Sequence, residues 1–122
     1  MHAGGCIGCH TPMDRGQPLP NMQFAGGQVF GSVASTNLTP DPTGISYYDT
    51  QLFRDVIRTG KVKARVLKLM PWWVFRNMTD DDLNAIFAYL RSVPPVRHRV
   101  DNSEPPTACR LCRQKHGAGA QN

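Results

Sequence analysis

Three residues near the start of the chain have the types and the spacing to hold a cofactor or a metal. Cys6, Cys9 and His10 form the pattern C-x-x-C-H, which is typical of covalent attachment of a c-type haem. Two thiols on one helical turn can each form a thioether with a haem vinyl group, and the next imidazole can bind the iron. A zinc knuckle would need two further ligands, and a thioredoxin-type disulfide would need a βαβ surround that the sequence does not indicate. The motif therefore favours one covalently bound haem.

Five methionines are candidates for the second ligand of such an iron. Met70 is the best placed, because it lies far along the chain from His10 and Pro71 holds it in an extended segment. The alternative for Met70 is a core side chain that fills a gap. The other four are less suited: Met1 is terminal, Met13 and Met22 lie close to His10 in sequence, and Met78 precedes the N-cap of a predicted helix.

The elements that must position these residues are mainly helices. Residues 50–59 and 80–92 have the apolar period of amphipathic helices, with Asp49 and Thr79 as N-caps. A short helix is expected over Cys6–His10, because positions i and i+3 then share a face. Residues 11–48 have many turn residues and no strong period, and a loop of that length is reasonable if it wraps around a large apolar cofactor. No strand is convincing, and "QVFGSV" is the best candidate.

A second pair of cysteines lies in the polar segment of residues 101–122, which we separate from a domain over residues 1–100. Cys109, Cys112 and His116 form a C-x2-C-x3-H pattern. A second haem is not expected, because no histidine directly follows Cys112. Zinc is one interpretation, with His98 as a fourth ligand. A Cys109–Cys112 disulfide, or a pair of free thiols, is the other.

The charge and the length of the chain limit the kinds of partner that it could have. The chain has 122 residues, a net charge of +5 and a pI of about 9.3, which fits one domain with an anionic partner or cofactor. No nucleic-acid motif is present, so nucleic acid is not expected as the partner. No stretch is apolar for long enough to span a membrane, so we expect no transmembrane segment. No signal sequence precedes Cys6, so we expect a chain that begins near its mature end or is truncated.

A basic segment precedes Met70. It holds six of the fourteen basic residues, opposed only by Asp55: Arg54, Arg58, Lys61, Lys63, Arg65 and Lys68. For any single one of them, a solvated surface position is sufficient explanation. Collectively they are expected to surround the exposed edge of the cofactor and to attract redox partner proteins with an acidic docking surface.

The motifs together resemble a known family. "AGGCIGCHTP", "NLTPDPTGI", "MPWW" and "MTDDDLNAIFAYLRSVPPV", which span about residues 4–96, resemble class I monohaem cytochromes c. They are most similar to the cytochrome c domains of bacterial periplasmic dehydrogenases. The resemblance implies an all-α cytochrome c fold of few short helices and long loops, with one haem c. It also implies Cys6 and Cys9 as thioether anchors and His10 and Met70 on the iron. Tyr48 falls where the family usually has a tryptophan at the haem edge.

The resemblance implies an electron carrier in the periplasm, not an enzyme. Such a carrier would accept electrons from a periplasmic dehydrogenase and pass them to the respiratory chain. One alternative is a haem sensor or peroxidase with a labile sixth ligand, and another is a haem-free Cys/His metal-binding module. The family normally has a helix before the C-x-x-C-H motif, and only "MHAGG" stands there. We therefore expect the face of Phe87, Tyr89 and Leu90 on the last helix to be under-covered.

Overall fold

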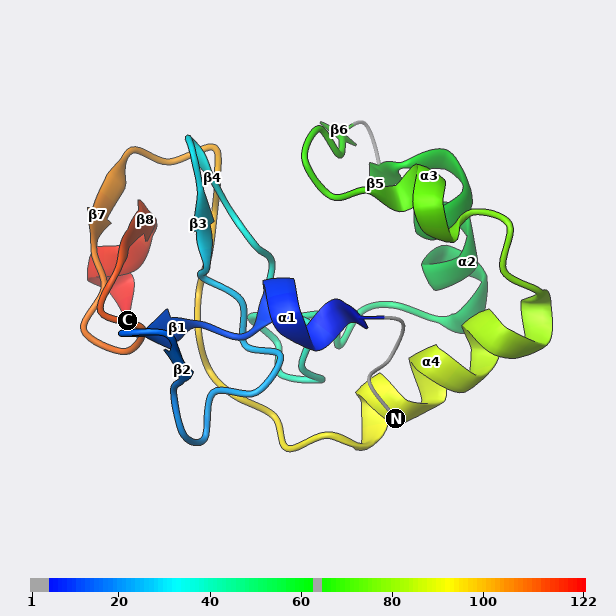
Figure 1. The fold of residues 1–122 in the computed structure, drawn as a ribbon, viewed down its shortest axis with the longest axis horizontal. Coiled ribbons are helices and arrows are strands. Elements are labelled where there is room, and N and C mark those ends of the chain that lie inside the picture. The colour runs from blue at the N-terminus through cyan, green and yellow to red at the C-terminus, as the bar shows by residue number, and fades with distance from the viewer. Residues whose placement is uncertain (1–4, 63–64) are drawn as a thin grey trace.

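The computed structural model describes residues 5–62 and 65–122, which form four α-helices, a short 3-10 helix and four small hairpins (Figure 1). The helices are α1 (Cys6–His10), α2 (Thr50–Thr59), α3 (Trp72–Phe75), α4 (Asp80–Ser92) and the 3-10 helix η2 (Gly119–Gln121). The hairpins pair β1 (Met13–Asp14) with β2 (Gln17–Pro18), β3 (Val29–Phe30) with β4 (Val33–Ala34), β5 (Lys61–Val62) with β6 (Arg65–Val66), and β7 (Pro106–Ala108) with β8 (Lys115–Gly117). In these ranges no helix combines the length and the apolar character that crossing a membrane requires.

The three predicted helices are confirmed, and their ends follow from local capping. The Asp49 carboxylate accepts a hydrogen bond from the backbone N–H of Leu52 at 2.7 Å, which satisfies one of the free donors at the start of α2. Gly60 ends α2 with φ +68°, and its N–H donates to the carbonyl oxygen of Val56. Local chemistry alone therefore sets the limits of α2.

The prediction of an all-α fold is not confirmed, because the described residues include four antiparallel hairpins. Their strands have only two or three residues each, which is too short for the two-residue alternation that identifies strands in a sequence. The segment "QVFGSV" contributes to one of these hairpins, β3–β4, with Gly31 in its turn at φ +63°. The long region without a helical period is thus folded into turns and small hairpins.

The helices α2, α3 and α4, with the hairpin β5–β6 beside them, lie on one side of α1, and the other three hairpins lie on the opposite side (Figure 1). Figure 1 shows α2, α3 and α4 on one side, and β1–β2, β3–β4 and β7–β8 on the other. Two separate apolar clusters match this division. The larger one joins α2 and α4 through residues such as Phe53 and Leu83, and the smaller one contains Met22, Cys109 and Cys112. Helix α1 therefore stands between two differently built halves.

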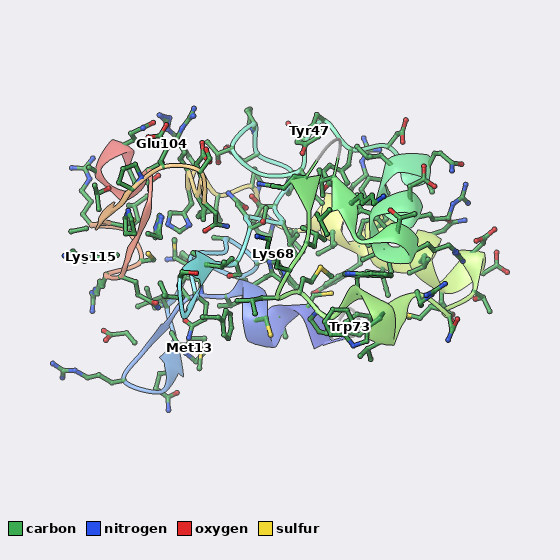
Figure 2. The ribbon with its side chains drawn as sticks, turned by 90° about the horizontal axis from the view of Figure 1, so that it is seen from above. Met13, Tyr47, Lys68, Trp73, Glu104 and Lys115 are labelled. Atoms are coloured by element: carbon green, nitrogen blue, oxygen red, sulfur yellow. The ribbon has the colours of Figure 1, made fainter. Side chains whose placement is uncertain are left out.

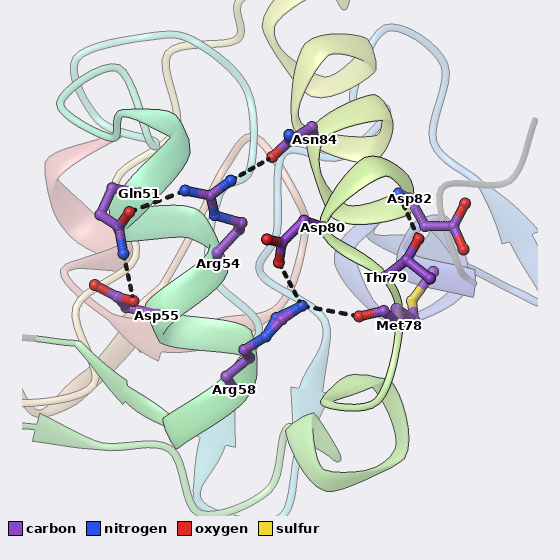
Figure 3. Close-up of polar contacts among 9 residues, drawn as sticks. All are labelled: Gln51, Arg54, Asp55, Arg58, Met78, Thr79, Asp80, Asp82 and Asn84. Atoms are coloured by element: carbon purple, nitrogen blue, oxygen red, sulfur yellow. Dashed lines mark hydrogen bonds and ion pairs between the residues drawn. The ribbon is translucent and has the colours of Figure 1, made fainter.

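Apolar and polar contacts join α2 to α4. The rings of Phe53 and Phe87 stack with centroids 5.1 Å apart. Arg58 on α2 forms an ion pair with Asp80 at 2.7 Å and donates to the carbonyl oxygen of Met78 at 2.9 Å (Figure 3). Phe87 and Leu90 are 2% and 0% exposed, so the prediction of an under-covered face is wrong for both. The larger apolar cluster, which includes Phe24, covers that face of α4. Tyr89 on the same face is half-buried, and its ring makes an edge contact with Phe24.

Candidate functional site

Helix α1 carries both cysteines of the motif as free thiols. Cys6 is half-buried against the larger cluster, whereas Cys9 is exposed. Burial raises the pKa of the Cys6 thiol, with a smaller contribution from the nearby Cys9. The helix thus presents one sulfur toward the interior and one toward solvent.

His10, at the end of α1, is held by a backbone carbonyl from a distant segment. Its Nδ1 donates to the carbonyl oxygen of Thr36 at 2.7 Å. A carbonyl oxygen can only accept, so the proton sits on Nδ1 and the lone pair sits on Nε2. Burial lowers the pKa of His10, which favours the neutral ring that can bind a metal. Sequence reasoning missed Thr36, because a backbone acceptor leaves no trace in residue type.

An apolar pocket brings Cys6 and Met70 together. Its lining has no charged side chain and consists of Cys6, Phe53, Ile57, Met70, Phe75, Met78, Leu83 and Ile86. Met78 shares the pocket, so location alone does not separate it from Met70. Met22 belongs to the smaller cluster on the other side of α1. His10 is not in the lining itself, although it lies at the end of the helix that begins with Cys6.

Tyr48 lies beside the larger cluster and not in the pocket lining. Its ring is half-buried, and it makes an edge contact with Tyr47 at a centroid distance of 4.9 Å. Burial raises the pKa of Tyr48, so its hydroxyl stays protonated across the ordinary pH range. Its contact with a haem edge stays a prediction.

The described members of the basic segment differ in their contacts. Arg58 is committed to Asp80, and Arg54 donates to Gln51 and Asn84, as Figure 3 shows. The other three described members are exposed: Lys61, Arg65 and Lys68. Lys63 falls outside the described residues. Of the six predicted residues, three are therefore exposed and available to a partner, whereas Arg54 and Arg58 help to join α2 to α4.

The residues of the tail pattern also meet in space. His98, Cys109, Cys112 and His116 are all buried, and their ligand atoms lie within 4.8 Å of one another. This cluster belongs to the hairpin half of the molecule. It is separate from the pocket that holds Cys6 and Met70.

The first site has the donors that a covalent haem needs. Two free thiols stand three residues apart on α1, and a neutral, oriented imidazole directly follows the second. The uncharged pocket beside them supplies apolar surface and a thioether sulfur. Fold and site together define a small haem-binding protein built from helices and tight turns.

Comparison with known proteins identifies the family. The family described as Cytochrome c matches residues 1–94, and the chain belongs to this family. Its cofactor is haem c, bound covalently, and its members transfer electrons. The chain is 39% identical over 99 residues to "Alcohol dehydrogenase (quinone), cytochrome c subunit" of Gluconobacter oxydans, covering 75% of this chain and 20% of that protein. It is 35% identical over 112 residues to "Gluconate 2-dehydrogenase cytochrome c subunit" of Pantoea cypripedii, covering 85% of this chain and 24% of that protein.

A third relative belongs to a dehydrogenase of another substrate. The chain is 34% identical over 98 residues to "Fructose dehydrogenase cytochrome subunit" of Gluconobacter japonicus, covering 77% of this chain and 20% of that protein. The chain thus spans a quarter or less of the length of these relatives. The three relatives match the chain over 98 to 112 residues, and each is named as a cytochrome subunit of a dehydrogenase.

Proposed function

We propose that this chain is an electron carrier in which His10 and Met70 would bind the iron of one haem. The observation that carries the proposal is the pocket that Cys6 and Met70 share, although they are far apart in sequence. When bound, the haem supplies an iron that changes its oxidation state by one electron. Cys6 and Cys9 would hold the haem by thioether bonds, and the Thr36 carbonyl fixes the ring orientation of His10.

The pocket residues set the reduction potential. Apolar side chains such as Phe53, Phe75 and Leu83 disfavour the extra positive charge of the oxidised centre. A methionine sulfur on the iron also favours the reduced state. Both effects raise the potential. If His10 and Met70 both bind the iron, no position would be left for a substrate, which suits a carrier better than a peroxidase or a gas sensor.

Two methionine variants test the ligand assignment, because Met70 and Met78 line the same pocket. We expect Met70→Ala to lower the reduction potential, remove the weak far-red band of the oxidised protein and allow carbon monoxide to bind the reduced protein. Met78→Ala is the matched control and should keep the band and exclude carbon monoxide. An unchanged spectrum and potential in Met70→Ala would overturn the assignment. Carbon monoxide binding by the unsubstituted protein at neutral pH would favour the sensor or peroxidase hypothesis.

The electron donor we propose is a dehydrogenase outside the cytoplasm. The relatives described above are cytochrome subunits of dehydrogenases, which supports this class of donor. Covalent attachment of haem needs reduced thiols and haem together outside the cytoplasm, so we place the protein in the periplasm. From there it would pass electrons to the respiratory chain. Haem staining of periplasmic and cytoplasmic fractions checks the location.

A basic and apolar surface beside the pocket is the docking site we propose for the redox partner. Lys61, Arg65 and Lys68 are exposed, and the same stretch of chain, residues 61–74, contains four apolar side chains that are each more than half exposed: Val66, Leu69, Trp73 and Val74. Exposed apolar side chains with a charged rim are typical of interaction sites. A partner with acidic side chains around an apolar centre would be complementary to it.

The docking proposal can be tested with a small anionic oxidant, hexacyanoferrate(III). We expect Lys68→Glu to slow oxidation of the reduced protein severalfold at low ionic strength, with the difference shrinking as salt is added. Lys115→Glu is the control, because it changes net charge equally but lies at the hairpin end, away from Lys68 and Trp73 (Figure 2). Equal slowing by both variants would show that only net charge matters and would overturn the site.

A further inference from the structure

Four buried side chains with metal-binding chemistry meet in the hairpin half of the molecule. His98, Cys109, Cys112 and His116 are between 0% and 3% exposed. Both cysteines are free thiols, and one ligand atom from each of the four residues lies within 4.8 Å of the others. Buried polar groups are normally hydrogen-bonded. The burial of two thiols and two imidazoles in one cluster therefore has to be explained by the partners that these groups have there.

Both histidines have their lone pair on Nε2, because a backbone carbonyl occupies the other ring nitrogen. Nδ1 of His98 donates to the carbonyl oxygen of Ala25 at 2.7 Å, and Nδ1 of His116 donates to that of Gly117 at 2.9 Å. Nε2 of His98 lies 3.4 Å from Sγ of Cys109. Nε2 of His116 is buried and has no hydrogen-bond partner among the described residues. A carbonyl on the far nitrogen is the usual support for a metal-binding histidine.

Each of the two sulfur atoms accepts a hydrogen bond from a nearby N–H group. The side-chain amide of Asn122 lies 3.4 Å from Sγ of Cys109 and donates to it. The backbone N–H of Gln114 donates to Cys112.

The backbone around the cluster is shaped to bring the ligands together. The N–H of Arg113 donates to the carbonyl oxygen of Cys109 at 2.9 Å, and Arg113 itself has φ +64°. This tight turn holds the two cysteines between β7 and β8. Gly27 also approaches closely, because a Cβ atom there would lie 2.5 Å from Cε1 of His98 and 3.2 Å from Sγ of Cys112. A side chain at Gly27 would enter the space beside the ligands.

We propose that His98, Cys109, Cys112 and His116 bind one zinc ion as a structural Cys2His2 site. Two thiolates and two imidazoles match the preference of zinc for tetrahedral sulfur and nitrogen donors. At ordinary Zn–S and Zn–N bond lengths, neighbouring ligand atoms are roughly 3.3–3.8 Å apart. The 3.4 Å separation of the His98 nitrogen and the Cys109 sulfur falls in that range. Four protein ligands close the coordination sphere, so the site stabilises structure and leaves no position for a substrate.

The zinc would link the tail to the loop of Ala25 and Gly26, which contacts His10. Nδ1 of His98 donates a hydrogen bond to the carbonyl oxygen of Ala25. The N–H of the next residue, Gly26, donates to the carbonyl oxygen of His10 at 2.7 Å. The apolar cluster on this side is small, and the two cysteines are themselves part of it. A metal would therefore add a crosslink where little apolar burial is available.

Metal content of the haem-loaded protein is the first test. We expect zinc and iron in a 1:1 ratio by inductively coupled plasma mass spectrometry. The zinc K-edge absorption spectrum should fit two sulfur neighbours at about 2.3 Å and two nitrogen neighbours at about 2.0–2.1 Å. Iron does not contribute to that edge, so the haem does not interfere. A second iron per haem would overturn zinc as the metal.

Variants then locate the ion on these four residues. Cys112→Ser and His116→Ala should each lose most of the bound zinc while keeping one haem per chain. Lys115→Ala changes an exposed residue of the same hairpin, β7–β8, and should keep the 1:1 ratio. If a variant fails to fold, zinc K-edge data on the unsubstituted protein still decide the ligand set. A zinc-free protein with a Cys109–Cys112 disulfide, detected as a mass 2 Da lower with no free thiol, would overturn the proposal. Zinc retained by both variants would do the same.

Discussion

The backbone N–H of Gly26 donates to the carbonyl oxygen of His10 at 2.7 Å, which ties the end of α1 to a loop of positive-φ residues. The same loop accepts the hydrogen bond from His98 through Ala25. The two candidate metal sites therefore share one stretch of backbone. A change in this loop should affect both, which motivates the first prediction.

Gly26→Ala should destabilise the protein strongly. Gly26 has φ +71°, and a Cβ atom there would lie 2.5 Å from the carbonyl oxygen of Ser35 and from the carbonyl carbon of Thr36. Such a Cβ atom would displace Thr36, whose carbonyl oxygen orients His10. We expect a loss of about 2–5 kcal/mol in the free energy of unfolding, from backbone strain and overpacking together. Chemical denaturation of the haem-loaded protein measures it.

The control for this prediction is Gly16→Ala. Gly16 has a similar φ of +79°, but a Cβ atom there meets nothing within 4 Å. Only conformational strain should remain, at about 1–2 kcal/mol. Equal losses for the two variants would show that the close approach of Gly26 to Thr36 is unimportant.

Asn37→Ala should also destabilise the fold, because one buried amide joins two distant segments. Its Nδ2 donates to the carbonyl oxygens of Val96 and His98 at 2.9 and 3.1 Å, and its Oδ1 accepts from the N–H and hydroxyl of Thr39. Truncation leaves several buried groups without partners, so we expect a loss of about 2–4 kcal/mol. Asn77→Ala, at an exposed position, should stay within about 0.5 kcal/mol of the unsubstituted protein.

The ion pair between Arg58 and Asp80 should contribute little, despite its 2.7 Å length. The Asp80 side chain is 66% exposed, and exposed pairs are typically worth less than about 1 kcal/mol. Asp81→Asn is the control, because it removes a charge from the same first turn of α4 but leaves the ion pair of Asp80 intact. It therefore measures the loss of the favourable interaction between a first-turn carboxylate and the helix dipole alone. A difference above about 1 kcal/mol between Asp80→Asn and Asp81→Asn in thermal unfolding would contradict this prediction.

Asp101 should make a small contribution to stability that disappears in acid. The hydroxyl and backbone N–H of Ser103 donate to its carboxylate at 2.6 and 2.9 Å and lower the pKa of Asp101. A lowered folded-state pKa stabilises the protein above the unfolded-state pKa, and this stabilisation is lost as pH falls through the folded-state value. Ser103→Ala should therefore be less stable than the unsubstituted protein at pH 7, and the gap should narrow in acid. Ser32→Ala, at an exposed turn, should show no such narrowing.

The sequence by itself determined the haem motif and the limits of α1, α2 and α4, whereas the one-turn helix α3 was not predicted. These features depend on contacts between residues a few positions apart: Asp49 with Leu52, Thr79 with Asp82, and the two cysteines on one turn. Such signals stay readable because the local backbone geometry is the same in any tertiary context. The small hairpins were not predicted, since two-residue strands are too short to show an alternating pattern.

Only the tertiary structure decided which distant groups meet. The acceptor for His10 is a carbonyl 26 positions away, and every residue type has one. The spacing of Cys109, Cys112 and His116 allowed zinc, a disulfide or free thiols alike. Their burial around His98, with the lone pair of His116 lacking a partner among the described residues, is a result of packing and favours the metal. Packing sums many weak contacts between distant segments, and no short stretch of sequence contains that sum.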